Sequence, residues 1–338
     1  MNKKALKADL LLLLTAAIWG FGFVAQRSGM EYVGPFAFNG VRFILGSLSL
    51  LPIIFFRRKK NADNSAGHAS FKHLLYVSLL AGSLLFLAVL IQQLGILFTT
   101  AGNAGFITCL YVVFTPIFGI FFGRKTGKAT WVGSVLTLCG LYFLSVAGRP
   151  AINPGDIIVF ISALLWAAHV LLIDRLMHID IQRKETIDPI ELSAGQFAVC
   201  GIFMMIGAFF AESHVIPVFE KINPVLLAEG LFEWLPFPVL VSALRAGTMQ
   251  LSFEMLIPIL FGGLCSVGIA YTLQVVAQRN APPAHATIIL CFEGSFAALG
   301  GVLLLSEKVG VWTLFGFILM LAGMLATQWN SYKIEKLN

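Results

Sequence analysis

Long apolar runs separated by short polar segments follow one another along the whole chain. Each run has the roughly 20 residues that a helix needs to cross a hydrocarbon core of about 30 Å. We count ten, at residues 10–26, 36–56, 74–98, 104–122, 130–147, 157–177, 190–211, 255–277, 283–305 and 311–329. The pattern predicts an all-α integral membrane protein with ten transmembrane helices.

Composition supports this interpretation and excludes several classes of protein. Hydrophobic residues make up 58% of the chain and charged residues 12%, and the mean hydropathy is +0.87, far from the values of soluble domains. All five cysteines fall inside the apolar runs, which favours buried small side chains over disulfides or metal ligands. The sequence has no HExxH and no GxxxxGK[ST] motif, so it carries the signature of neither a zinc protease nor an ATP-driven pump.

Basic residues are concentrated in every second segment between the runs. With the N-terminus in the cytoplasm, 17 of the 23 Lys and Arg residues fall in cytoplasmic segments, as the positive-inside rule requires. Both termini are therefore predicted to be cytoplasmic, and the protein is predicted to be a multi-pass protein of the cell membrane. The net charge of +6 serves this orientation and contact with anionic lipid, so nucleic acid is not a predicted partner.

The second half of the chain repeats the first. The matched pairs are Asp9 with Asp156 and Trp19 with Trp166 at an offset of 147, and Gly133 with Gly316 and Gly140 with Gly323 at an offset of 183. These matches predict two five-helix repeats, at residues 1–150 and 151–338, the second carrying an extracytoplasmic insertion of about 40 residues near 213–253. Because five is odd, the second repeat enters the membrane inverted, an arrangement typical of secondary transporters.

The insertion near 213–253 is rich in aromatic and proline residues. Two interpretations of it stay open. Amphipathic helices could lie in the outer interface and cover the mouth of a cavity, or the segment could be a surface addition without a role in transport.

The ninth apolar run combines one carboxylate with a line of small residues. Glu293 lies in its middle, where an ionised group costs about 2.5–3.5 kcal/mol and should therefore face protein or a watery cavity. Gly294 with Ala298 and Ala297 with Gly301 are spaced four apart, which lets a neighbouring helix approach closely. Glu293 is the first candidate for binding a cationic group or a proton; the alternative is a packing carboxylate hydrogen-bonded to a neighbour.

Other polar and aromatic side chains inside the runs are candidates for a solute-binding site. For Arg42 three roles stay open: snorkelling to the outer interface, pairing with Glu293, or holding a substrate carboxylate. Trp19 and Trp166 occupy equivalent places in the two repeats and are predicted to face a shared cavity, where their rings suit amphipathic or cationic solutes. The remaining candidates, each with helix packing or hydrogen bonding as the alternative, are His169, Thr108, Tyr111, Gln93 and Gln274.

The chain resembles EamA-type members of the drug/metabolite transporter superfamily in the segments TAAIWGFGFVAQR, FNGVRFILGSL and CFEGSFAALGGVLLLSEKVGVWTLFGFILMLAG. The resemblance covers nearly the whole chain. It implies rocking of the two repeats around a cavity bounded by helices 1, 3, 4, 6, 8 and 9. It also implies movement of small metabolites, often outward. The Glu-Pro pair common in the ninth helix of the family is Glu293-Gly294 here, so the fold carries over better than the residue-level detail.

Together these observations predict a secondary transporter of small metabolites, namely amino acids or related amphipathic or cationic solutes. Alternating access is the predicted mechanism, and export is the direction that the resemblance implies. The alternatives are a membrane-embedded enzyme acting on lipid, which would need clustered catalytic groups, and a non-transporting sensor or scaffold. No cofactor is predicted. Predicted partners are the solute, the bilayer, a proton as coupling ion and a second copy through helices 5 and 10; proton antiport and facilitated diffusion or exchange both stay open.

Overall fold

The computed structural model of the chain describes residues 3–29, 34–60, 70–99, 101–123, 126–145, 154–183, 187–210, 253–305 and 311–335. Throughout these residues the chain is helical apart from short turns, and it contains no strand there. Seven of the described helical stretches are long and apolar enough to cross a membrane. The predicted insertion near 213–253 lies outside the described residues except for its last residue, Phe253.

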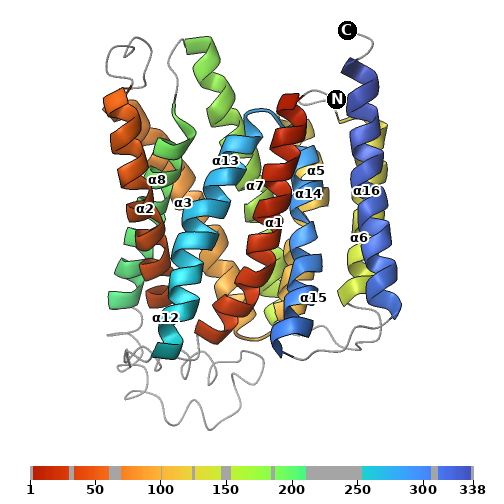
Figure 1. Cartoon of the computed structure of the whole chain (residues 1–338), viewed down its shortest axis with the longest axis horizontal. Coiled ribbons are helices and arrows are strands. Elements are labelled where there is room, and N and C mark those ends of the chain that lie inside the picture. The colour runs from red at the N-terminus through yellow and green to blue at the C-terminus, as the bar shows by residue number, and fades with distance from the viewer. Residues whose placement is uncertain are drawn as a thin grey trace.

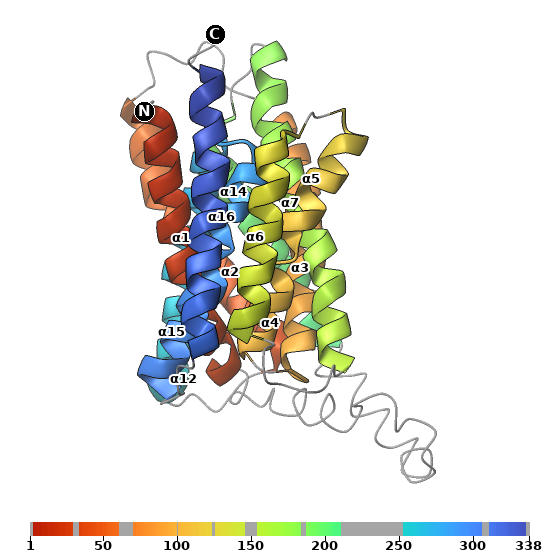
Figure 2. The same ribbon diagram turned by 90° about the vertical axis from the view of Figure 1, so that its right-hand side faces the viewer.

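The helices stand side by side as one upright bundle (Figures 1 and 2). α1 begins at the end of the bundle where α16 ends (Figure 1). The unbroken helices are α1 (Lys3–Gly29), α2 (Pro35–Lys60), α3 (Phe71–Ile96), α6 (Lys128–Ser145), α7 (Pro154–Arg183), α8 (Pro189–Gly207) and α16 (Val311–Glu335).

Three stretches predicted as continuous helices are interrupted in the structure. The fourth is split into α4 (Ala101–Thr108) and α5 (Tyr111–Phe121), and the ninth into α14 (Pro283–Leu290) and α15 (Phe292–Leu305). The eighth consists of α12 (Phe253–Leu260), the π-helix η3 (Phe261–Tyr271) and α13 (Thr272–Gln278). Hydropathy reports only the length of an apolar run, so it cannot predict these interruptions. The π-helical kind is frequent at functional sites.

Close helix packing fixes the position of the ninth stretch against α1. A Cβ added at Gly20 would lie 2.7 Å from the Glu293 carbonyl oxygen and 2.8 Å from the Ala297 nitrogen. Only glycine fits at this point, because real Cβ atoms do not approach backbone atoms so closely. Ala297, one of the small residues predicted to form a seam, therefore packs against a glycine of α1 at the turn of α15 that carries Glu293.

We expect Gly20→Ala to destabilise the protein by about 1–3 kcal/mol, because the added methyl group overpacks the contact between α1 and α15. Gly22→Ala on the same helix is the matched control, since its new Cβ would meet the Ser266 hydroxyl at an ordinary 3.6 Å. Thermal unfolding of the detergent-solubilised variants measures the difference. Equal melting temperatures for the two variants would contradict this tight contact.

Glycines allow α6 and α16 to pack closely against each other. A Cβ at Gly140 would lie 2.6 Å from the Gly316 carbonyl oxygen, and one at Gly323 would lie 2.7 Å from the Gly133 carbonyl oxygen. The glycine faces are thus occupied within the chain. A dimer through these helices would have to use other faces of α6 and α16, such as the side of α16 that exposes Leu314, Ile318 and Leu325.

Polar contacts tie helices together at the two ends of the bundle. His285 Nε2 lies 2.8 Å from Asp9 Oδ1, which joins the start of α14 to α1. At the other end, the Thr99 hydroxyl donates to Asp156 Oδ1 at 2.5 Å, which joins the turn after α3 to the start of α7. Asp9 and Asp156 are the two carboxylates matched in the sequence at an offset of 147, and their contacts lie at opposite ends of the bundle.

Candidate functional site

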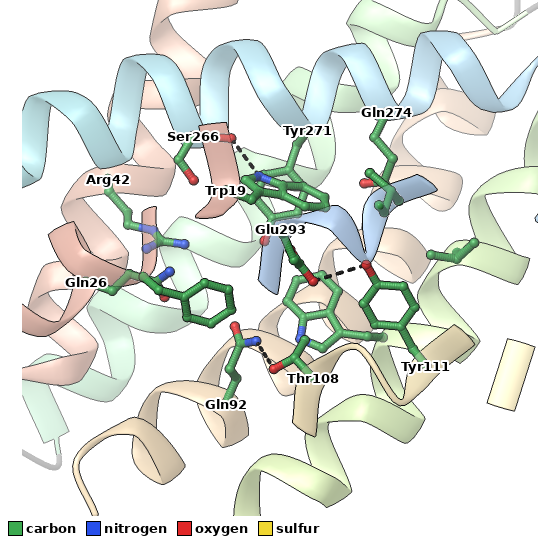
Figure 3. A pocket seen from close by; sticks show the side chains of 14 residues that line it. Trp19, Gln26, Arg42, Gln92, Thr108, Tyr111, Ser266, Tyr271, Gln274 and Glu293 are labelled. Carbon is green, nitrogen blue, oxygen red and sulfur yellow. Dashed lines mark hydrogen bonds between the residues drawn. The ribbon is translucent and has the colours of Figure 1, made fainter. Parts of the chain in front are cut away.

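A cavity lies among the interrupted helices, α1, α2, α3 and α7 (Figure 3). It encloses about 470 Å³ of space free of protein atoms, including its open mouth. Its lining is Trp19, Phe23, Gln26, Arg42, Gln92, Thr108, Tyr111, Trp166, Val170, Ser266, Tyr271, Gln274, Leu290 and Glu293. The lining combines aromatic rings, neutral amides and hydroxyls, one guanidinium and one carboxylate.

Glu293 lies in the first turn of α15, directly after the break at Cys291. Its Oε1 accepts hydrogen bonds from the Tyr111 hydroxyl at 3.1 Å and from the Cys109 thiol at 3.6 Å. It forms no ion pair with any basic side chain in the part of the chain that the structure describes. A carboxylate that is 3% exposed and has no counter-ion in such a site can bind a proton or a cationic group.

Reciprocal hydrogen bonds between two cysteines join the two helix breaks beside Glu293. The Cys291 thiol donates to the Cys109 carbonyl oxygen at 3.2 Å, and the Cys109 thiol donates to the Cys291 carbonyl oxygen at 3.5 Å. Each of these carbonyl groups also accepts a backbone N–H, from Val112 at 3.0 Å for Cys109 and from Gly294 at 3.2 Å for Cys291. The reciprocal thiol bonds therefore add a link between the two breaks, beside which Tyr111 and Glu293 line the cavity.

Three aromatic rings form one wall of the cavity. The Trp19 and Tyr271 ring centroids are 4.5 Å apart, and Trp166 stacks on Tyr271 at 5.9 Å. The Trp19 indole donates to the Ser266 carbonyl oxygen of η3 at 3.3 Å, which fixes its orientation. Such a wall can bind an apolar group or the face of a cation.

Arg42 projects from α2 into the same cavity (Figure 3). Its side chain is 2% exposed, so it does not snorkel to an interface. The guanidinium lies over the rings of Phe38 and Phe43, 5.7 Å and 5.2 Å from their centroids, and it forms no ion pair with Glu293 or any other described carboxylate. Two of the three roles open for it, snorkelling and direct pairing with Glu293, are therefore not seen in this structure.

The comparison with known protein families fits this arrangement. The model of the EamA-like transporter family matches residues 6–146 and 234–328, more than half of the chain. The chain belongs to this family. It is accordingly a multi-pass membrane protein and a transporter.

Relatives of this EamA-like transporter are named as transporters too, and their names specify no solute. A transporter of Archaeoglobus fulgidus is 29% identical over 94% of this chain and 85% of the relative. The transporter YoaV of Bacillus subtilis is 23% identical over 94% and 95%, and the inner membrane transporter YedA of Escherichia coli is 30% identical over 44% and 47%. A protein of known crystal structure shares the fold, with a TM-score of 0.68 at 14% identity over 97% of this chain and 98% of that one.

Seven of the nine predicted site residues of this EamA-like transporter line the cavity: Glu293, Trp19, Trp166, Thr108, Tyr111, Arg42 and Gln274. The other two, Gln93 and His169, do not. His169 is buried between α7 and α8, where its Nε2 lies 3.0 Å from Gln196 Oε1. Gln93 is fully buried on α3, and it is its neighbour Gln92 that lines the cavity and donates to the Thr108 hydroxyl at 2.8 Å.

Several lining residues were not predicted from the sequence. Phe23 and Gln26 follow Trp19 at helical spacing of four and seven, so the α1 face was recognisable in the sequence. Ser266 and Tyr271 are five apart, a spacing that puts two side chains on one face only in a π-helix. No sequence pattern indicated that geometry.

Proposed function

We propose that this protein is a secondary transporter that moves a small solute through the central cavity by alternating access. The observation that carries the proposal is the position of Glu293. It is a buried carboxylate without a counter-ion, held where two interrupted helices from different halves of the chain meet. A transporter needs its polar binding group at such a place, near mid-bundle and between parts that can move relative to one another.

Inverted repeats of five helices each, 1–150 and 151–338, are part of this proposal. Tyr111 and Glu293 are 182 residues apart, as are Cys109 and Cys291, so each hydrogen-bonded pair joins positions within one residue of those matched at the offset of 183. α1 starts at one end of the bundle and α7 at the other (Figure 1). α6, the stretch α14–α15 and α16 would complete ten spans.

The position of the cavity supports a state in which the end with the helix starts α1 and α14 is shut. Trp19, Phe23 and Gln26 lie in the second half of α1, and Arg42 lies near the start of α2 at the opposite end. Contact between Asp9 and His285 bridges α1 and α14 on the shut side. Opening this side would require the contact to break.

Breaking the contact between Asp9 and His285 is expected to shift the protein toward the opposite access state. One hydrogen bond of about 1 kcal/mol changes a two-state equilibrium about fivefold. In His285→Ala, a cysteine placed at Gln26 should therefore be labelled more slowly by a membrane-impermeant maleimide added from the cavity side. Cys139, which is exposed, is first replaced.

Thr99→Ala is the matched variant, because it removes the contact to Asp156 at the other end of the bundle. The contact to Asp156 is present at the open end, so the change of access state that breaks the Asp9–His285 contact does not require it to break, and this variant is expected to leave the labelling rate nearly unchanged. Equal slowing of labelling in both variants would contradict the assignment of the Asp9–His285 contact to the shut side.

The proposed solutes are small metabolites such as amino acids or related amphipathic or cationic compounds, and export is the proposed direction. The aromatic wall suits an apolar or cationic portion, and the amides and hydroxyls of Gln92, Thr108 and Gln274 supply neutral hydrogen-bonding groups.

A ligand screen followed by flux measurements tests the proposal. Purified protein is melted with amino acids, nucleosides, organic cations and sugars at pH 6 and pH 8, since a bound ligand stabilises by RT ln(1 + [L]/Kd). Compounds that stabilise it are then tested for uptake into proteoliposomes, with and without a proton gradient. Saturable uptake confirms transport, and its response to the gradient separates proton exchange from facilitated diffusion. Stabilisation by a ligand without any uptake would contradict a transport function.

A further inference from the structure

The cavity contains a buried cation without a counter-ion. Arg42 is 2% exposed, and its Nε and Nη1 have no hydrogen-bond partner. Its contacts are the faces of Phe38 and Phe43 and the hydroxyl of Tyr271. Arginine stays protonated in proteins, so the charge cannot be removed by losing a proton. Burying a charged group whose donors lack partners costs free energy unless an anion binds to it.

The same cavity contains the complementary group. Glu293 faces it from α15, and the two charged side chains form no ion pair with each other. Arg42 comes from the second helix and Glu293 from the ninth stretch, so they enter the cavity from separate elements (Figure 3). The cavity is therefore lined by one positive group, the Arg42 guanidinium, and one negative group, the Glu293 carboxylate, and neither has a counter-ion.

We propose that the solute is a zwitterion, whose carboxylate binds Arg42 and whose ammonium group binds Glu293. This inference rests on the proposed function, in which the cavity is the path of the solute. The rings of Trp19, Trp166 and Tyr271 lie along the wall and would hold the apolar portion of the molecule. Arg42 is thus assigned a role as the residue that determines specificity for an anionic group.

Simpler charge classes fit the cavity less well. A monocation would satisfy Glu293 and leave the guanidinium unpaired and repelling the ligand. A monoanion would satisfy Arg42 and be repelled by Glu293. A zwitterion neutralises both groups in one step and brings its own charges into the cavity as a pair, which lowers the cost of desolvating it.

Three closely similar compounds test the inference: leucine as the zwitterion, leucinamide as the cation and N-acetyl-leucine as the anion, with the phenylalanine series in parallel. Binding to the purified protein is measured by thermal shift and calorimetry, and uptake is measured separately in proteoliposomes. Wild type is expected to bind a zwitterion at least tenfold more tightly than its cationic or anionic derivative. Tighter binding of either derivative, or no binding of any of the six compounds, would overturn the inference.

Variants that remove one charge each test whether Arg42 and Glu293 bind the charged groups of the solute. Arg42→Gln is expected to lose the preference for the zwitterion over the cation, whereas Arg42→Lys keeps it. Glu293→Gln is expected to lose the preference over the anion. Equal weakening of all three compounds in Arg42→Gln would show that Arg42 is only structural. If Arg42→Gln fails to fold, the binding preferences of wild type, Glu293→Gln and Arg42→Lys still test whether the site selects a zwitterion.

The binding and flux arms separate the two proposals. Binding with the expected charge preference but no uptake would contradict transport and leave the zwitterion site standing. Uptake of other solutes with no preference for zwitterions would leave transport standing and overturn the site.

Discussion

Glu293→Gln is expected to reduce binding and transport of the solute about 30-fold or more while leaving the protein folded. Removing one partner of a buried, hydrogen-bonded charge pair typically costs about 2–5 kcal/mol, and 1.4 kcal/mol is a factor of ten. Glutamine has nearly the same shape and keeps an oxygen that can accept from the Tyr111 hydroxyl, which lies 3.1 Å away. Uptake into proteoliposomes, measured with a solute identified by the binding screen, gives the size of the loss.

Glu191→Gln is the matched control for removal of a carboxylate. Glu191 pairs with Arg58 at an exposed end of α8, remote from the cavity lining, and its substitution is expected to leave uptake unchanged. Normal uptake with unaltered pH dependence in Glu293→Gln, at normal expression, would remove Glu293 from the path of both solute and proton.

Trp166→Ala is expected to lower the free energy of unfolding by about 3–5 kcal/mol, the usual cost of deleting a buried Trp side chain. The ring is 6% exposed and contacts Trp19, Tyr271 and His169. Its loss leaves a space in the aromatic wall and frees the other rings to shift. Thermal and denaturant unfolding of the purified variant measure the effect, and binding of the solute is expected to weaken in parallel.

Trp312→Ala deletes the same side chain from the start of α16, where the ring is 57% exposed and stacks on Phe143 of α6. This variant is expected to lose much less stability, because little buried surface is removed. Equal losses in the two variants would show that the Trp166 ring does not carry the packing assigned to it.

The helical architecture could be predicted from the sequence because hydropathy reports directly on it. The apolar runs located the helices, whereas the close packing of α6 against α16 through Gly140 and Gly323 emerged only from the structure. The helix breaks could not be predicted. The breaks at Cys109 and Cys291 are joined by thiol hydrogen bonds between the two halves of the chain, and a local pattern carries no information about such a distant partner.

The candidate site was recognisable where a polar residue was out of place in an apolar run. Glu293 and Arg42 stood out for this reason, and Trp19 with Trp166 stood out because the repeat matched them. His169 met the same criterion but bonds to Gln196, since a buried polar group can be satisfied by a neighbouring helix as well as by a cavity. Tyr271 was overlooked because aromatic residues are ordinary in membrane helices, and only the tertiary contacts with both tryptophans reveal its role.

The unlike partners at matched positions have a thermodynamic consequence. Under the proposed two-fold arrangement, identical halves would make the two access states equal in free energy and the solute affinities on the two faces the same. At the offset of 183, Leu110 stands where Glu293 stands in the other half, and the contacts of Asp9 and Asp156 have different chemistry. These differences make the free energies of the two access states unequal, so the state of lower free energy is the resting state. The half-saturating concentrations on the two sides of the bilayer then differ, although net flux still vanishes at equal solute activity unless a gradient is coupled to it.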